Sequence, residues 1–187
     1  LLGDDKTLKQ QFDAPITAMA WRGDGTVIAL GFKTGAINFV DSKTGKVLFR
    51  STGHLGQVNA LAFSPDGKRL LCEQYLILNA DGKRVIRLPV VLDLSTGAVA
   101  PLNGFSPNAE LQGYCWSPDG KQILFRASRD ADGVLSRGAL YTVPVAGGPA
   151  AKLPMPLAGA GTGFALLSTY PEEEVWRIVA PLYAEGS

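Results

Sequence analysis

This sequence of 187 residues has few cysteines and histidines, and its positive and negative charges nearly balance. It holds Cys72, Cys115 and a single histidine, His54. Two cysteines cannot form the disulfide framework of a small secreted domain, and these three residues are too few and too scattered for a zinc site. Eighteen basic and seventeen acidic side chains give a net charge of +1. A dedicated nucleic-acid binder usually carries a strong excess of positive charge, which this sequence does not have. We therefore expect no metal, no cofactor and no nucleic-acid partner.

Long hydrophobic runs are also missing. The longest small and apolar run, residues 158–167, is interrupted by three glycines and is about half the length that spans a bilayer. We predict no membrane span. No charged-then-apolar signal segment precedes the first repeat, and no Asn-x-Ser/Thr acceptor occurs. These absences select no compartment, so the bacterial periplasm and the cytoplasm both stay open.

What the sequence does contain is a repeat of ten residues that ends in Asp-Gly. Three copies align without a gap, at 16–25 (ITAMAWRGDG), 58–67 (VNALAFSPDG) and 111–120 (LQGYCWSPDG). Asp-Gly between two strand-forming runs is a strong hairpin signal, because glycine supplies the positive φ of a tight turn. Each copy is therefore predicted to be a first strand and the turn that follows it.

Further strands and turns follow each copy. The second strands are predicted at 26–32, 69–78 and 122–127, and a second turn is predicted at 41–45 and 93–97 before outer strands at 46–50 and 98–102. The copies are 42 and 53 residues apart, and residues 79–88 and 128–138 account for the longer spacing as extended hairpins or loops. Four short strands in each repeat predict an all-β fold, a β-propeller of four-stranded antiparallel blades.

The first strand of each repeat has one small face and one bulky face. Read at period two, the first copy places Ala18 and Ala20 on one face and Met19 and Trp21 on the other. The same positions carry Ala60, Ala62, Gly113 and Cys115 on the small face, and Leu61, Phe63, Tyr114 and Trp116 on the bulky face. Blades converge at a central axis, so a small face is expected to pack against the bulky face of the next blade.

We predict one propeller region over residues 1–187. Its parts are the end of a blade at 1–12, three blades at 16–50, 58–102 and 111–153, and a partial blade at 163–183. The chain is thus expected to begin and end in mid-blade. A fragment of a longer propeller is favoured over a small ring of three blades plus a composite one. Open blade edges would make self-association a further expectation.

The repeats resemble a known family. The second repeat resembles the WD repeat in three successive motifs: Gly53-His54, VNALAFSPDG at 58–67, and Leu92-Asp93. The third repeat, residues 111–153, is more similar to the related TolB-type repeat. The resemblance implies a propeller. The namesake Trp-Asp pair stands here as Val40-Asp41 and Leu92-Asp93, and only one repeat has Gly-His. In the family that histidine joins a buried network with an aspartate, a hydroxyl residue and the tryptophan, so the resemblance implies a partial network at most.

Motifs for catalysis or ligand binding are incomplete. No Gly-x-Ser-x-Gly elbow occurs, and His54 precedes Ser136 by some eighty residues, which excludes a serine-hydrolase triad. Residues 128–133 look like the start of a calcium loop, but Ala139 stands where the bidentate glutamate would be. The glycines of 159–163 match no phosphate or dinucleotide motif. Cys115 is interpreted as a packing residue, and we predict no enzyme activity.

The sequence thus predicts a non-catalytic propeller that binds a protein or peptide partner through loops. The resemblance implies that the contact residues lie between the second and third strands and before each first strand. The candidates are Lys33, His54, Gln57, Tyr75, Arg129, Asp130 and Asp132. Two alternatives stay open: the accessory propeller of a larger enzyme such as a prolyl-oligopeptidase-like peptidase, and a TolB-like periplasmic protein.

Overall fold

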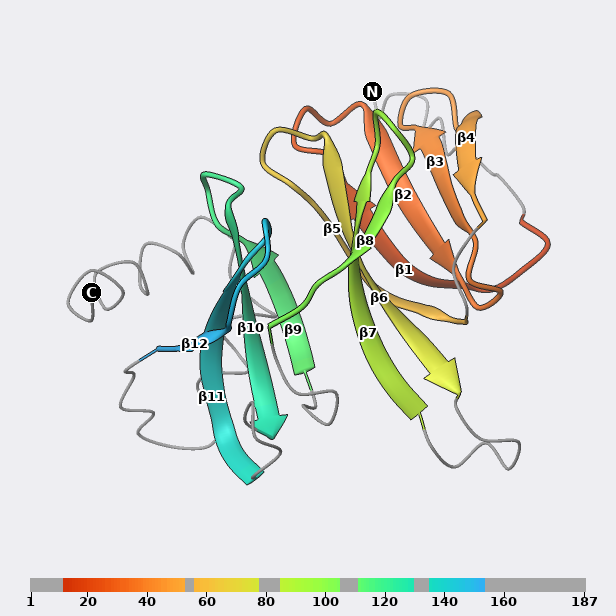
Figure 1. Ribbon diagram of the computed structural model, residues 1–187. Coiled ribbons are helices and arrows are strands. Elements are labelled where there is room, and N and C mark those ends of the chain that lie inside the picture. Colours follow the sequence, from red (N-terminus) through yellow and green to blue (C-terminus); the bar gives the residue numbers. More distant parts are fainter. Residues whose placement is uncertain (1–11, 53–55, 78–84, 105–110, 130–134, 154–187) are drawn as a thin grey trace, which may run out of the picture.

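Twelve strands in three sheets make up the described part of the computed structural model, residues 12–52, 56–77, 85–104, 111–129 and 135–153 (Figure 1). Each sheet has four antiparallel strands that follow one another in chain order. No helix occurs among these residues. The predictions of an all-β chain and of four-stranded antiparallel blades are confirmed.

The three sheets follow one another along the chain, and we refer to them as blades A, B and C. Blade A contains β1 (Ile16–Trp21), β2 (Val27–Phe32), β3 (Ile37–Asp41) and β4 (Val47–Ser51). Blade B contains β5 (Val58–Phe63), β6 (Arg69–Ile77), β7 (Val85–Asp93) and β8 (Val99–Pro101). Blade C contains β9 (Leu111–Trp116), β10 (Gln122–Arg129), β11 (Leu135–Pro144) and β12 (Ala151–Lys152).

The Asp-Gly turns join the first two strands of each blade. Gly25, Gly67 and Gly120 have φ of 70°, 67° and 67° there, the left-handed region in which only glycine is unstrained. Part of the extra length of blades B and C lies in longer middle strands, since β6 and β7 have nine residues each and β10 and β11 have eight and ten, where β2 and β3 have six and five. The predicted partial blade at 163–183 lies outside the described residues.

The expected packing of small faces on bulky faces is confirmed at both blade junctions. Ala18 and Ala20 of β1 pack against a core cluster that includes Phe63 of β5. Ala62 of β5 packs in turn against the cluster around Trp116 of β9. The first strand, with one small face and one bulky face, therefore fills the wedge between neighbouring blades at the junction of A with B and at that of B with C.

Three contacts hold blade B against blade C beyond this packing. The indole Nε1–H of Trp116 donates to the carbonyl of Ala62 at 3.0 Å, and the Arg69 guanidinium lies 5.0 Å above the indole ring. The Nη2 of Arg69 also donates to the carbonyl of Gly120 at 2.8 Å. The tryptophan is fully buried, so its polar edge and its ring face both have partners in the neighbouring blade.

Candidate binding surface

The strands present two ends that differ in the kind of connection they carry. The β1–β2 and β3–β4 turns lie together at one end, where Ser42 Oγ donates to the Gly25 carbonyl at 2.7 Å. We call this the turn end. Because the strands are antiparallel, the β2–β3 connection and the chain that leads from one blade to the next lie at the opposite end, here called the loop end.

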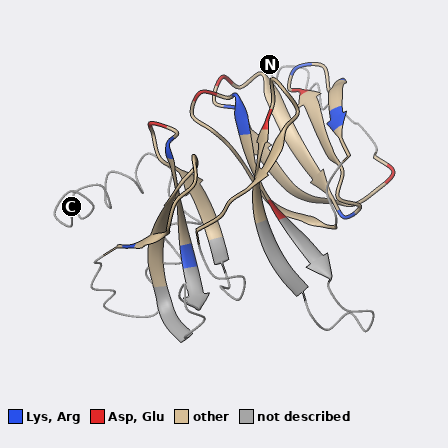
Figure 2. Cartoon of the chain, viewed as in Figure 1, with Lys and Arg blue, Asp and Glu red and all other residues tan. Residues whose placement is uncertain are grey.

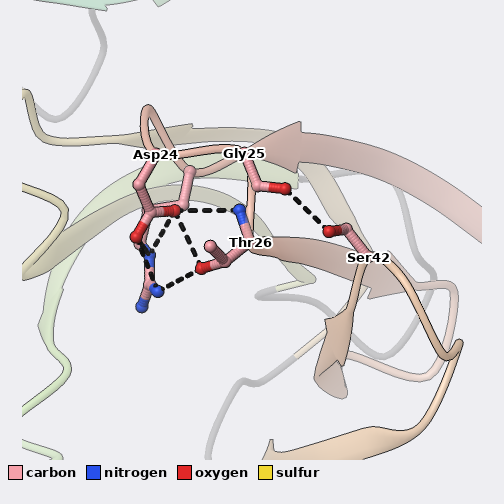
Figure 3. A network of polar contacts seen from close by, with 5 residues as sticks. Asp24, Gly25, Thr26 and Ser42 are labelled. Carbon is pink, nitrogen blue, oxygen red and sulfur yellow. Dashed lines mark hydrogen bonds and ion pairs between the residues drawn. The ribbon is translucent and has the colours of Figure 1, made fainter.

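The carboxylates of the turn end are engaged in the turns themselves. Asp24 accepts hydrogen bonds from Arg22 Nε at 3.0 Å and from the backbone N–H of Thr26 at 2.9 Å (Figure 3). Chiefly the bond from Arg22, followed by that from the Thr26 backbone, lowers the pKa of Asp24 to about 2. Asp93 likewise accepts from the hydroxyl and the backbone N–H of Ser95, and the hydroxyl bond is the largest cause that lowers its pKa to about 2.

In the Asp-Gly turns of blades B and C, a serine hydroxyl donates to the turn aspartate. Ser64 Oγ donates to Asp66 at 2.6 Å and accepts from the backbone N–H of Arg69 at 2.9 Å. Ser117 and Asp119 repeat this arrangement in blade C. The aspartate that marks each repeat is therefore a turn-stabilising residue, and at least one of its carboxylate oxygens accepts hydrogen bonds within the turn.

The loop end of blades A and B is held together by backbone and hydroxyl contacts. Thr17 Oγ1 of β1 donates to the carbonyl of Val58 in β5 at 2.6 Å, which ties the two inner strands. The backbone N–H of Lys33 donates to the carbonyl of Pro15 at 3.0 Å. This contact fixes the β2–β3 turn against the segment that enters blade A.

Two of the predicted contact residues have described side chains at this loop end. Lys33 is exposed on the β2–β3 turn. Gln57 is half-buried directly before β5, and its Nε2 donates to Asn59 Oδ1 at 2.9 Å. The structure thus places Lys33 and Gln57 at the same end of adjacent blades.

The other predicted contact residues lie at or near the limits of the described chain. His54, Asp130 and Asp132 lie outside the described residues. The backbone of Tyr75 pairs with Arg87 in the β6–β7 hairpin, and that of Arg129 pairs with Leu135 at the end of β10. Both pairs belong to the parts of the hairpins nearest the loop end, and the role of these residues stays a prediction.

A groove that sequence reasoning missed lies between the inner strands of blades A and B, near the turn end. Its volume is about 310 Å³, and its lining includes Met19, Trp21, Leu61 and Pro65. Met19 and Trp21 belong to the bulky face of β1, and their side chains are 66% and 57% exposed. The repeat pattern predicts a packed environment for this face. Its exposure could be recognised only once the neighbours of blade A were known.

Charge does not gather into a patch of one sign on the described residues. Figure 2 shows basic and acidic positions scattered over all three sheets. No group of three or more His, Cys, Asp or Glu side chains converges within the described ranges. Any recognition by these residues would therefore depend on individual side chains and on shape.

Cys72 and Cys115 are both buried in the sheets, and neither forms a disulfide bond. Burial alone raises the pKa of the Cys72 thiol far above its usual range. Because the thiolate is the reactive form, we expect iodoacetamide to leave Cys72 unmodified in the folded chain and to alkylate it in concentrated urea. Mass spectrometry of the tryptic peptides measures both, and equal alkylation with and without urea would contradict the buried position.

The comparisons with known proteins agree on the architecture. A family model described as the anaphase-promoting complex subunit 4 WD40 domain matches residues 6–64. Among solved structures, the tricorn protease superimposes with a TM-score of 0.54 at 17% sequence identity, over 73% of this chain and 14% of that one. At this identity the superposition shows the fold alone. The WD40 match over residues 6–64 supports the predicted resemblance to WD-type repeats, and the described residues form three blades of the β-propeller fold.

One curated relative is similar to part of the chain. The U3 small nucleolar RNA-associated protein 21 of Saccharomyces cerevisiae is 32% identical over 112 residues, which cover 55% of this chain. The matched region spans 11% of the length of that relative. The WD40 match and this relative support a protein-interaction role in general. Among the described residues, no helix is long and apolar enough to cross a membrane.

Proposed function

We propose that this chain is a non-catalytic platform for a protein or peptide partner and that the partner binds the loop end of blades A and B. The observation that carries the proposal is the exposed side chain of Lys33 on a turn whose backbone is fixed by its bond to Pro15. A contact residue on a rigid backbone loses little conformational freedom on binding, which favours affinity.

The difference between the two ends supports this choice. At the turn end, Asp24, Asp66, Asp93 and Asp119 already accept hydrogen bonds within their own turns. At the loop end, the amide of Gln57 bonds only locally to Asn59 and lies beside the tie between Thr17 and Val58. Loops on a rigid scaffold are the usual place for recognition residues.

A pair of charge reversals tests the proposal. Lys33→Glu is expected to lower recovery of the bound partner by about tenfold, equivalent to ~1.4 kcal/mol, because it places a like charge against acidic groups that lysine would attract. Lys43→Glu is the matched control, since Lys43 is an exposed lysine in the β3–β4 turn, at the turn end. The intact protein, tagged, is purified from its own cells, and the co-purified proteins are quantified by mass spectrometry.

The proposal fails if the two variants recover every partner equally. A partner lost only with Lys43→Glu would place the contact at the turn end. Peptide hydrolysis by the intact protein would favour the alternative of an accessory propeller in a larger enzyme. The likeness to the tricorn protease does not carry that activity here, because it concerns the fold alone.

A further inference from the structure

The outer strand of blade A carries two exposed apolar side chains next to each other. Leu48 and Phe49 of β4 are 49% and 44% exposed. Phe49 stacks on Phe39 of β3, with the ring centroids 4.0 Å apart and an angle of 14° between the ring planes. Its ring is therefore held by β3 on one side and is open to a partner on the other. An exposed aromatic ring of fixed position beside an exposed leucine is typical of a protein contact surface.

A β-bulge sets the direction of Leu48. The register pairs Phe49 with Phe39 and Val47 with Val40, so Leu48 is the extra residue of β4. A bulge interrupts the regular ladder and re-aims a side chain. Val47 still packs against a core cluster of blade A, whereas Leu48 projects into solvent. The exposure of this leucine is therefore built into the strand.

A cation stands at each end of this apolar pair. Lys46 directly precedes β4 and Arg50 directly follows Phe49, and both cationic side chains are exposed. Figure 2 shows a basic position on β4. Within the described chain, neither cation forms a salt bridge. The nearest acidic residue in the sequence, Asp41, accepts from the backbone N–H and the hydroxyl of Thr44 in its own turn. Both cations can therefore bind a carboxylate from outside.

The outer strands of the other two blades lack this combination. In blade B, β8 has three residues and no charged one, and Pro101 ends it. In blade C, β12 consists of Ala151 and Lys152, without a large apolar side chain. An apolar pair between two cations is therefore particular to β4 among the described blades.

The charges of β4 decide which occupant fits. Two copies of β4 that met antiparallel around Leu48 would place Lys46 of each copy against Arg50 of the other, and like charges opposite each other destabilise such a pair. The bulge also disturbs pairing between strand edges. A segment with acidic residues on both sides of apolar ones would instead place opposite charges against both cations and cover the apolar pair.

We propose that Lys46, Leu48, Phe49 and Arg50, here called the β4 surface, bind a segment of another protein in which apolar residues are flanked by aspartate or glutamate. The leucine and phenylalanine side chains contact the apolar residues of that segment, and the two cations contact its carboxylates. The β4 surface lies on an outer strand, away from the turn of Lys33, so this inference does not depend on the partner proposed for the loop end.

Two synthetic peptides that differ only in charge test the proposal on the intact protein. The probe is fluorescein-labelled Asp-Asp-Val-Leu-Thr-Leu-Asp-Asp, and the control is Lys-Lys-Val-Leu-Thr-Leu-Lys-Lys with the same label. Two adjacent charged residues at each end present one charge on each face of an extended peptide. By fluorescence anisotropy at low salt, we expect saturable binding of the acidic peptide alone. Equal binding of the two peptides, or no saturable binding of the acidic one, would overturn the proposal.

Charge-reversal variants of exposed residues locate the bound peptide. Lys46→Glu and Arg50→Glu are each expected to weaken binding of the acidic peptide by about fivefold, because each exchanges an attraction for a repulsion. Lys152→Glu, the same change on the outer strand of blade C, is the matched control and should leave binding unchanged. The double variant Lys46→Glu/Arg50→Glu is expected to bind the basic peptide instead, which also shows that it is folded.

Three outcomes of these measurements contradict the β4 surface. Equal losses with Arg50→Glu and Lys152→Glu would overturn the proposal, and so would a folded double variant that still prefers the acidic peptide. A dimer in light scattering that the acidic peptide dissociates would identify a second copy as the occupant and would also overturn it. Lys33→Glu should leave binding of the acidic peptide unchanged, so a failure here is distinguishable from a failure at the loop end.

Discussion

Replacing Trp116 with alanine is expected to lower the free energy of unfolding by about 3–5 kcal/mol, the usual cost of removing a fully buried large aromatic side chain. Three contacts are lost together: the packing on Ala62 and its neighbours, the hydrogen bond from Nε1 to the Ala62 carbonyl, and the stacking under Arg69. Each kcal/mol of lost stability lowers the Tm of a chain of this size by roughly 2–4 °C, so the decrease in Tm is large enough to measure. Chemical denaturation followed by circular dichroism measures the change.

Two further variants separate the contributions at this junction. Trp116→Phe keeps most of the apolar volume but removes the indole N–H, and it is expected to cost about 0.5–1.5 kcal/mol because the hydrogen bond to the Ala62 carbonyl is lost. Leu48→Ala is the control for an exposed hydrophobic residue, and it should have little effect because Leu48 is 49% exposed. If Trp116→Ala cost no more than Leu48→Ala, the packing between blades B and C described above would be wrong.

Replacing Gly31 with alanine is the second change expected to have a large effect. A Cβ at Gly31 would stand 2.5 Å from Val58 Cγ1 and 2.8 Å from Val58 Cβ, across the junction of blades A and B. Such overpacking typically costs about 1–3 kcal/mol, and more where the backbone cannot move. Movement is restricted here because Thr17 Oγ1 donates to the Val58 carbonyl at 2.6 Å and lies within 3.3 Å of the Gly31 carbonyl. Urea denaturation of the variant measures the loss.

A double-mutant cycle shows whether the loss comes from this one contact. Val58→Ala removes the Cγ1 atom that a Cβ at position 31 would meet at 2.5 Å and keeps the Val58 Cβ at 2.8 Å, so Gly31→Ala should cost less in its presence than alone but should still destabilise the chain. Gly23→Ala is the matched glycine control, because a Cβ there meets nothing within 4 Å and its φ is not in the left-handed region. Strict additivity of Gly31→Ala and Val58→Ala would contradict the contact.

Most of the strand pattern could be predicted from the sequence because it depends on short-range chemistry. The Asp-Gly turns at 24–25, 66–67 and 119–120 need glycine for a positive φ, and the apolar runs beside them favour strands. The alternation of small and bulky residues in β1, β5 and β9 also predicted which faces meet. Strand lengths were less predictable, since β7 already begins at Val85, within the residues expected to connect it to β6.

The candidate contact surface could be predicted only in part. Lys33 and Gln57 were candidates because the family resemblance implies contact residues in these loops, and the structure puts both at the loop end of adjacent blades. The occupied acceptors of Asp24 and its equivalents could not be read from residue types, because they depend on how each turn folds back on itself. Those hydrogen bonds are the reason why the turn end is the weaker candidate.

The sequence by itself determined the repeat, the hairpins and the two faces of each inner strand, because neighbouring residues decide turns and periodicity. Only the tertiary structure decided which of those faces is covered. Trp21 and Trp116 hold the same position in their repeats, yet one side chain is 57% exposed and the other is fully buried. The difference arises because burial is a property of the neighbouring blade, and the small face that covers Trp116 belongs to a segment some fifty residues away in the chain.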